Sequence, residues 1–194
     1  MLLKEKFKDK SIILASQSPR RRELLAGLGL EFSTISLDID ETFDRNIYKA
    51  HQITEYLSAK KANAYQALKA NEIIITSDTT VWANNESLEK PKDREDAYRM
   101  IKALSNNTHA VYTSVTLKSV DKEVTFTAET KVTFAALDDE EIYFYIDQYQ
   151  PYDKAGAYGI QEWIGYIGVE KIDGSYFNVM GLPVHQLYKE LQKF

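Results

Sequence analysis

The sequence has no cysteine among its 194 residues, which excludes disulfide scaffolds, zinc fingers, iron–sulfur clusters and catalysis by a thiol. Histidine is also scarce. The three present, His51, His109 and His185, share no metal-ligand spacing, so a histidine-based zinc site and a Ser-His-Asp triad are both poorly supported. Any metal should therefore be a hard divalent cation held by carboxylate and phosphate oxygens.

An excess of basic charge and long hydrophobic runs are lacking too. The chain carries 24 Lys and Arg against 29 Asp and Glu, so no sequence-wide basic field attracts nucleic acid or anionic lipid. No apolar run approaches the ~20 residues of a membrane span, and the first residues lack the apolar stretch of ~7–15 residues that a signal peptide needs. We therefore expect a cytoplasmic protein with no nucleic-acid or membrane partner.

Short apolar runs alternate with helical patterns along the chain, and hydrophobic residues make up 44% of it. The predicted strands are residues 12–15, 32–35, 73–76 and 163–172, with a long hairpin over 111–134. The predicted helices are residues 20–28, 54–70, 93–104, 138–147 and 183–191. This order predicts an α/β fold: a single domain, residues 1–194, with a central twisted mixed sheet in two lobes around a cleft.

The helix predicted from residue 20 begins with an unusual charge pattern. Ser18 is a suitable N-cap and Pro19 a suitable first residue, but the first turn then carries Arg20, Arg21 and Arg22. Cations there oppose the helix macrodipole, whereas a bound phosphate would be met by backbone N–H groups and arginine side chains together. The alternative is an ordinary surface helix with its arginines in solvent. The chain has no GxxxxGK[ST] or GxGxxG loop, which weakens P-loop and Rossmann interpretations.

Acidic residues follow two of the predicted strands. Asp78 comes directly after a buried strand, where open α/β sheets bind ligands, and a carboxylate there can bind Mg²⁺ or take a proton from water. The alternative is an Asp that caps a turn. Asp40 and Glu41 follow another strand and could supply further oxygen ligands or simply be solvated. Lys61, on a predicted helix, and Lys90, in a predicted loop, are by themselves typical of solvated lysines.

These segments together resemble one family. Residues 14–25, LASQSPRRRELL, are similar to the opening signature of the Maf-like nucleotide pyrophosphatases. Four later segments agree in order: Asp40-Glu41; Asp78-Thr79; residues 89–93; and residues 153–161 with 174–183. The resemblance covers nearly the whole chain. It implies an α/β fold related to the inosine triphosphate pyrophosphatases, usually dimeric, with a cleft between two lobes. It also implies hydrolysis of nucleoside triphosphates to the monophosphate and pyrophosphate.

The resemblance also implies roles for the acidic residues and the lysines. Asp78 becomes the proton acceptor that prepares water for attack at the α-phosphorus. Glu41 aligns with an acidic residue near a divalent metal, Mg or Mn, which Asp78 would share. Lys61 and Lys90 fall on cationic phosphate contacts.

For the remaining candidates, the resemblance implies phosphate binding and base selection. Ser16, Arg20 and Arg21 fall on the phosphate-binding loop. Arg20, Thr79 and Gln161 match positions that help to choose the base. The form Ala-Tyr-Gly-Ile-Gln at residues 157–161 is similar to the subgroup that acts on dTTP and UTP.

Two residues depart from the family pattern, and two other functions stay open. Ser77 stands where Ala is common, and Asn106 replaces a turn Gly; because Asn can adopt the left-handed conformation, we expect that turn to survive. One alternative substrate is 7-methyl-GTP or a modified nucleotide, against which Gln161 argues because an amide can pair with a pyrimidine edge. The other alternative is a nucleotide-binding regulator of septum formation, which would not need Asp78 as a base.

Overall fold

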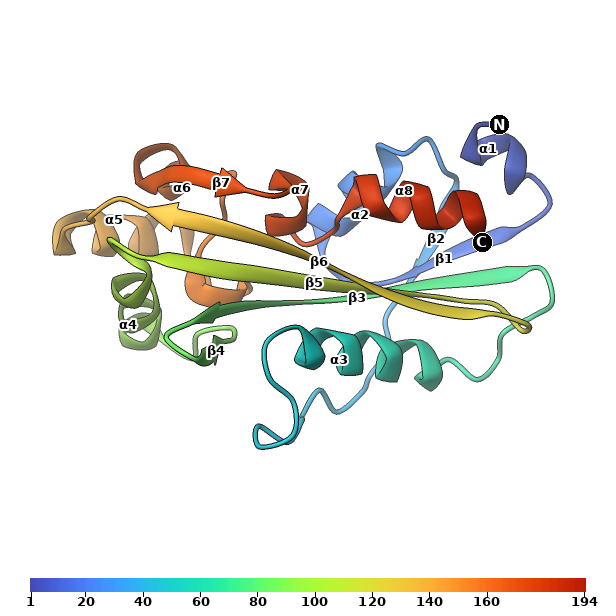
Figure 1. The fold of residues 1–194 in the computed structure, drawn as a ribbon, viewed down its shortest axis with the longest axis horizontal. Helices are drawn as coiled ribbons and strands as arrows, with labels where there is room; N and C mark the ends of the chain where they lie inside the picture. Colours follow the sequence, from blue (N-terminus) through green and yellow to red (C-terminus); the bar gives the residue numbers. More distant parts are fainter.

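One mixed sheet of seven strands runs through the computed structural model, which describes residues 1–194 (Figure 1). The strands are β1 (Ser11–Ala15), β2 (Phe32–Ile35), β3 (Glu72–Ala83), β4 (Glu86–Leu88), β5 (Thr108–Lys118), β6 (Glu123–Phe134) and β7 (Val169–Asp173). Their order is β2-β1-β3-β5-β6-β7, with β4 paired to β3. Strand β1 is parallel to β2 and β3, and every other pair is antiparallel. The predicted α/β fold with a mixed sheet is confirmed.

Helices cover both faces of the sheet (Figure 1). They are α1 (Leu3–Lys6), α2 (Pro19–Ala26), α3 (His51–Ala64), α4 (Arg94–Leu104), α5 (Asp139–Tyr149), α6 (Trp163–Gly168), α7 (Tyr176–Val179) and α8 (Val184–Lys193), with a 3-10 turn, η1, at Ala155–Ala157. Helix α3 packs on β3 and β5. Helices α2 and α8 pack on the opposite face. None of the helices combines the length and the apolar character needed to cross a membrane.

The alternation of side chains along β3 explains how its two faces are covered. Ile73 and Ile75 pack with Leu25 of α2 and Leu187 of α8 in one apolar cluster. Ile74 points the other way and belongs to a separate cluster. Successive side chains of a strand point to opposite faces, so every odd-numbered residue of this stretch faces α2 and every even-numbered residue faces α3.

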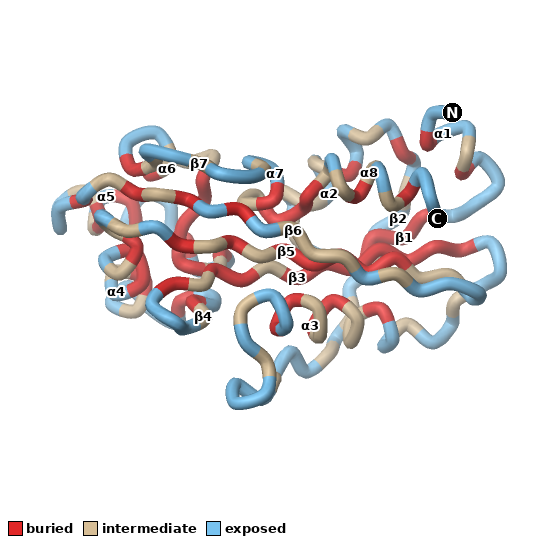
Figure 2. Tube along the Cα trace, viewed as in Figure 1, coloured by how far each residue is buried: buried red, intermediate tan, exposed pale blue.

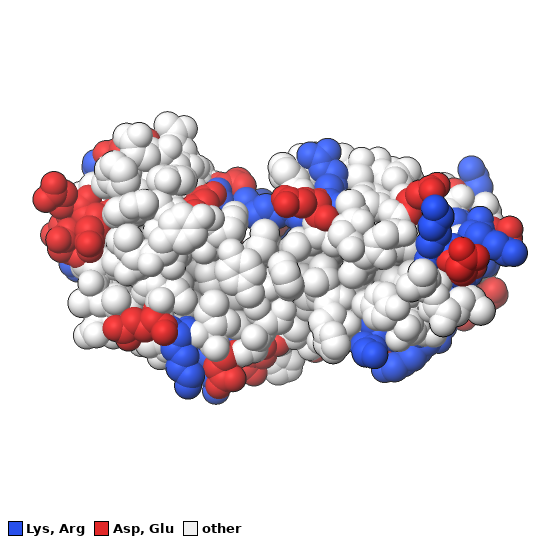
Figure 3. All heavy atoms as spheres, turned by 90° about the horizontal axis from the view of Figure 1, so that it is seen from above, with Lys and Arg blue, Asp and Glu red and all other residues white.

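The core is divided along the length of the sheet. A cluster of 13 buried residues lies where α1, α2 and α8 pack on β1, β3 and β5. A cluster of 18 lies where α4, α5 and η1 surround the other end. Strands β3 and β5 are buried along most of their length, whereas most loops at the periphery of the molecule are exposed (Figure 2). Between the two ends, Figure 3 shows a hollow at which acidic and basic side chains meet.

Most of the predicted elements are confirmed. Strands β1 and β2, the β5–β6 hairpin, and helices α4, α5 and α8 lie at the predicted positions, and α2 ends two residues early. Ser18 caps α2 and Pro19 is its first residue, as predicted. Asn106 adopts a left-handed φ of 52°, so the turn before β5 survives the replacement of Gly.

The helix predicted at 54–70 lies nearer the N-terminus than expected. Helix α3 begins at His51 and already stops at Ala64. Beyond it, the carboxylate of Glu72 accepts hydrogen bonds from the Lys69 backbone N–H at 2.9 Å and the Tyr65 hydroxyl at 3.5 Å. These contacts close a turn that leads directly into β3. The alanine- and lysine-rich pattern does not predict this turn, because the hydrogen-bond acceptor that closes the turn is a residue of the next strand.

The strand predicted at 163–172 is wrong over its first half, since α6 precedes β7 there. A Cβ on Gly165 would lie 1.8 Å from the carbonyl oxygen of Ile160, so only glycine fits this close backbone approach. Ile164 is buried in the larger core cluster. Tertiary packing of the helical turn therefore overrides the apolar, aromatic pattern that is typical of a strand.

Candidate active site

A cavity of about 650 Å³ lies between the two core clusters. It is within the usual range for a small-molecule site. Each of the predicted site residues lines it: Ser16, Arg20, Arg21, Glu41, Lys61, Asp78, Thr79, Lys90 and Gln161. These residues come from the start of α2, from α3 and β3, and from four loops. The fold therefore brings all of the sequence candidates to one cavity.

The cavity lies beside an unpaired edge of β3. Pairing with β1 ends at Ile75, and pairing with β4 begins only at Val81, whereas the other edge of β3 is paired with β5 throughout. Asp78 therefore lies inside β3 and not after a strand that ends at residue 76, which corrects our prediction. It is nevertheless beyond the carboxyl end of β1, where ligands bind in open α/β sheets.

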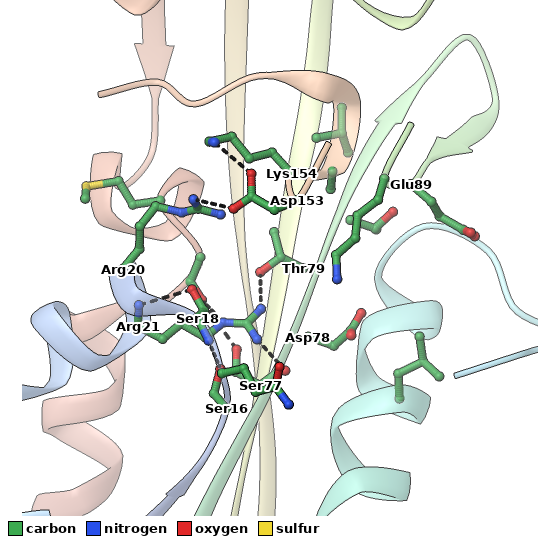
Figure 4. A pocket seen from close by; sticks show the side chains of 18 of the residues that line it. Ser16, Ser18, Arg20, Arg21, Ser77, Asp78, Thr79, Glu89, Asp153 and Lys154 are labelled. Atoms are coloured by element: carbon green, nitrogen blue, oxygen red, sulfur yellow. Dashed lines mark hydrogen bonds and ion pairs between the residues drawn. The ribbon is translucent and has the colours of Figure 1, made fainter. Parts of the chain in front are cut away.

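Asp78, which points into the cavity (Figure 4), is held by Lys61 on the α3 side of β3. Its Oδ1 lies 2.7 Å from Lys61 Nζ, and both side chains are only 12% exposed. The same ammonium lies 3.1 Å from Glu41 Oε1. Helix α3 is positioned for this contact by Thr76, whose hydroxyl donates to the Ser58 carbonyl at 2.7 Å. One cation is thus shared between two carboxylates at the cavity wall.

On the other side of β3, Arg21 anchors α2 to the strand. It donates to the carbonyls of Gly181 at 2.8 Å and Ser77 at 2.9 Å, and to Thr79 Oγ1 at 3.0 Å. Burial lowers the pKa of Arg21, while the nearby charge of Asp78 opposes this shift. The Ser77 carbonyl belongs to the unpaired edge of β3, so the guanidinium satisfies an acceptor that a neighbouring strand would otherwise bond. Much of the donor capacity of Arg21 is therefore already used within the protein.

Arg20 points to a different partner (Figure 4). Its only hydrogen bond is from Nη1 to Asp153 Oδ2, at 3.1 Å. Asp153 also binds Lys154 through Oδ1 at 2.8 Å, and Lys154 reaches Glu162 at 3.1 Å. Although burial raises the pKa of Asp153, Lys154 and Arg20 lower it to below its usual value. Residues 153–161 match the family resemblance in sequence, but their pairing with Arg20 was not predicted, because Asp153 is 133 residues away along the chain.

A hydroxyl network continues from Thr79 into the sheet. Thr79 Oγ1 lies 3.0 Å from Thr113 Oγ1, and Thr113 donates to the Asn178 carbonyl at 3.1 Å. The Asn178 side chain in turn donates to acceptors on β5 and β6. Thr113 and Asn178 were not predicted from the sequence, because alternating Thr is ordinary in a strand and a lone Asn carries no local signal. The Gln161 Oε1 atom lies at this cavity without a hydrogen-bond partner.

The remaining candidates lie at the ends of the cavity. Ser16 Oγ accepts from the backbone N–H of Ser18 at 3.2 Å, which shapes the loop before α2. Lys90 is exposed, and no carboxylate pairs with it. Its neighbour Glu89 forms an ion pair with Arg45 at 2.8 Å. The Lys90 ammonium is therefore available to an anion in the cavity.

The carboxylates fit a divalent cation only with help from a ligand. Asp78 and Glu41 supply hard oxygen atoms, which Mg²⁺ and Mn²⁺ prefer, and both approach the same Lys61 ammonium. No group of three or more His, Cys, Asp or Glu side chains is arranged to hold a metal ion. Mg²⁺ is commonly bound through one or two carboxylates together with substrate phosphates, and the pair present here matches that pattern.

The fold and this cavity agree with a family assignment. The family model described as Maf-like protein matches residues 11–194, and the chain belongs to this family.

Several curated proteins are similar over nearly their whole length. A dTTP/UTP pyrophosphatase of Parabacteroides distasonis is 52% identical over 192 residues, covering 98% of this chain and 99% of that protein. A dTTP/UTP pyrophosphatase of Flavobacterium johnsoniae is 51% identical over 191 residues, covering 98% of both chains. One of Porphyromonas gingivalis is 45% identical over 194 residues, covering 98% of this chain and 97% of that protein.

Proposed function

We propose that this protein is a dTTP/UTP pyrophosphatase, a hydrolase that converts these nucleotides to the monophosphate and pyrophosphate. The observation that carries the proposal is that all nine candidate residues line one cavity. Relatives that are about 50% identical to this chain over nearly their whole length bear that name. The cavity also combines the two parts the reaction needs, which are cations for a triphosphate and a carboxylate for water.

The triphosphate would lie between the start of α2 and the two lysines. The first turn of a helix offers free backbone N–H groups, and Arg20 has only one hydrogen bond within the protein. Lys90 is exposed at the other side of the cavity. Positive groups placed around the phosphates stabilise the negative charge that shifts toward the leaving pyrophosphate in the transition state.

Asp78 is the proton acceptor in this mechanism. Lys61 binds Oδ1 and fixes the orientation of the carboxylate, so the other oxygen can accept a proton from water as the water attacks the α-phosphorus. The α–β anhydride bond then breaks, and pyrophosphate leaves. A divalent cation bound by Asp78, Glu41 and phosphate oxygens would add charge neutralisation at the phosphates.

Base selection would involve Thr79, Gln161 and Arg20. The Gln161 amide offers both an acceptor and a donor, which can match the N3–H and a carbonyl of thymine or uracil. Its Oε1 has no protein partner, so a ligand N–H would satisfy a buried acceptor that is otherwise unpaired.

We also propose that residues 1–194 form one nucleotide pyrophosphatase domain related to the inosine triphosphate pyrophosphatases. The two core clusters would then be the two lobes, with the cavity between them. A homodimer is part of this proposal, on the basis of the family resemblance in sequence.

A panel of nucleotides tests the proposed function. Pyrophosphate release would be measured from dTTP, UTP, CTP, GTP, ATP and 7-methyl-GTP, each with Mg²⁺, with Mn²⁺ and with EDTA. We expect dTTP and UTP to lead, and EDTA to abolish release. Release led by 7-methyl-GTP would keep the reaction and refute the base preference. Thermal stabilisation by a nucleotide without any release would favour the nucleotide-binding regulator.

A further inference from the structure

The environment of Arg20 differs from that of Arg21 in a way that the proposed function does not explain. Arg21 makes three hydrogen bonds to β3 and to the loop at Gly181, so its position is set by the fold. Arg20 has a single contact, with Asp153, and its side chain is 24% exposed. A long side chain with one contact loses conformational freedom when it binds a ligand, unless that contact already holds it in place. The orientation of Arg20 therefore depends on what holds Asp153.

Asp153 is itself held by a buried lysine. The Asp153 side chain is 58% exposed, but Lys154 Nζ, whose side chain is 9% exposed, binds its Oδ1 at 2.8 Å. The two oxygens of Asp153 are thus divided, with Oδ1 bound to Lys154 and Oδ2 bound to Arg20. A carboxylate clamped at both oxygens has a defined plane, and it directs the guanidinium into one orientation.

Lys154 is fixed from below by a second carboxylate. Glu162 lies 3.1 Å from its ammonium, and Glu162 also accepts a hydrogen bond from the hydroxyl of Tyr145, which is fully buried. The Tyr145 hydroxyl accepts from the Gly159 backbone N–H at 2.9 Å. A Cβ on Gly159 would lie 2.8 Å from the Glu162 carboxyl carbon, so the loop closes tightly over this pair. The contacts that support Asp153 therefore run through Lys154 and Glu162 to the fully buried side chain of Tyr145.

We propose that Asp153 and Lys154 are positioning residues, which hold the Arg20 guanidinium at the cavity in the orientation that receives a nucleotide phosphate. This inference rests on the proposed function. Neither residue need touch the reacting atoms. Asp153 acts through Arg20, and Lys154 acts through Asp153, with Glu162 balancing the charge of the lysine.

The variant Asp153→Asn gives a test with opposite signs for two explanations. If Asp153 positions Arg20, the loss of its charge should raise the KM for dTTP and the Kd of α,β-imido-dUTP about threefold to tenfold, with kcat within about twofold. If Asp153 instead competes with phosphate for Arg20, both constants should fall. Unchanged or lowered constants would overturn the proposal.

Asp147→Asn is the matched control. Asp147 is an exposed aspartate that pairs with Arg94 at 2.7 Å on α4 and does not line the cavity, so its substitution should leave both constants unchanged. α,β-Imido-dUTP resists cleavage at the scissile bond, and its Kd reports on Arg20 without turnover. A wild-type protein that binds the analogue but releases no pyrophosphate from dTTP would refute the proposed function, while the comparison of Kd values would still decide the role of Asp153.

A second variant separates positioning from folding. Lys154→Met alone leaves the partly buried Glu162 carboxylate, whose side chain is 19% exposed, without its cation, so thermal stability should fall. The double variant Lys154→Met/Glu162→Gln removes both charges and should recover part of that stability. Its KM and its Kd for the analogue should nevertheless stay raised at least threefold, because Asp153 has lost its support. A stable double variant with wild-type constants would show that Lys154 has a structural role only.

Discussion

The substitution Asp78→Asn tests the central assignment of the mechanism. Asp78 lies within β3 at the unpaired edge, and its Oδ1 accepts from Lys61 at 2.7 Å. Asparagine has nearly the same shape and keeps an oxygen atom for Lys61, but it cannot take up a proton from water. The change therefore removes the proposed base and leaves the packing around it intact.

The structure allows the two expected effects to be estimated. A general base contributes about 10²- to 10⁴-fold to a rate, which is about 3–5 kcal/mol of the barrier. Breaking a buried ion pair can destabilise a protein by about 3–5 kcal/mol when the partner is left alone. Lys61 is not left alone, because Glu41 remains 3.1 Å away. We therefore expect a stability loss of only about 1 kcal/mol, or a Tm about 2–4 °C lower.

The assay is pyrophosphate release from dTTP at saturating substrate, combined with thermal unfolding of the same preparation. We expect kcat to fall at least about a hundredfold while the unfolding transition stays cooperative and close to that of the wild type. Retention of more than about a tenth of kcat would refute the assignment of Asp78 as the base. A large fall in Tm would instead mean that the Lys61–Glu41 pair cannot replace the lost charge.

Two further predictions concern stability. Burial lowers the pKa of His109 to about 4, below the ~6.5 of an unfolded chain, so unfolding takes up a proton between these values. The stability of the folded protein should therefore fall by about 3 kcal/mol as the pH drops from 6.5 to 4. The measurement is urea unfolding of the wild type and of His109→Phe at each pH. A difference in unfolding free energy that does not change with pH would contradict this. Gly156→Ala should cost about 1–3 kcal/mol more than Gly29→Ala, because both have φ near +70° but only the Cβ at 156 meets Val81, at 2.9 Å. Equal losses in urea unfolding would argue against this crowding.

The elements that sequence analysis predicted correctly are those with local signals. Ser18 and Pro19 mark the start of α2 through one hydrogen bond and one restricted dihedral angle, and both are properties of neighbouring residues. The apolar spacing of α4 is likewise local, and its four predicted core positions, Ala97, Met100, Ile101 and Leu104, are buried. The predictions of a helix through residue 70 and of a strand from residue 163 were wrong, because the structure of each segment depends on a contact from another element.

The sequence by itself determined the family, the α/β class and the nine candidate residues, because these depend on residue types and their spacing along the chain. Only the tertiary structure decided their arrangement. It placed Asp78 inside a strand, since pairing with β5 continues where β1 ends. It also bound Arg21 to the fold and left Arg20 to Asp153, which lies 133 residues away. Contacts over such distances arise when separate elements pack together, and no local pattern encodes them.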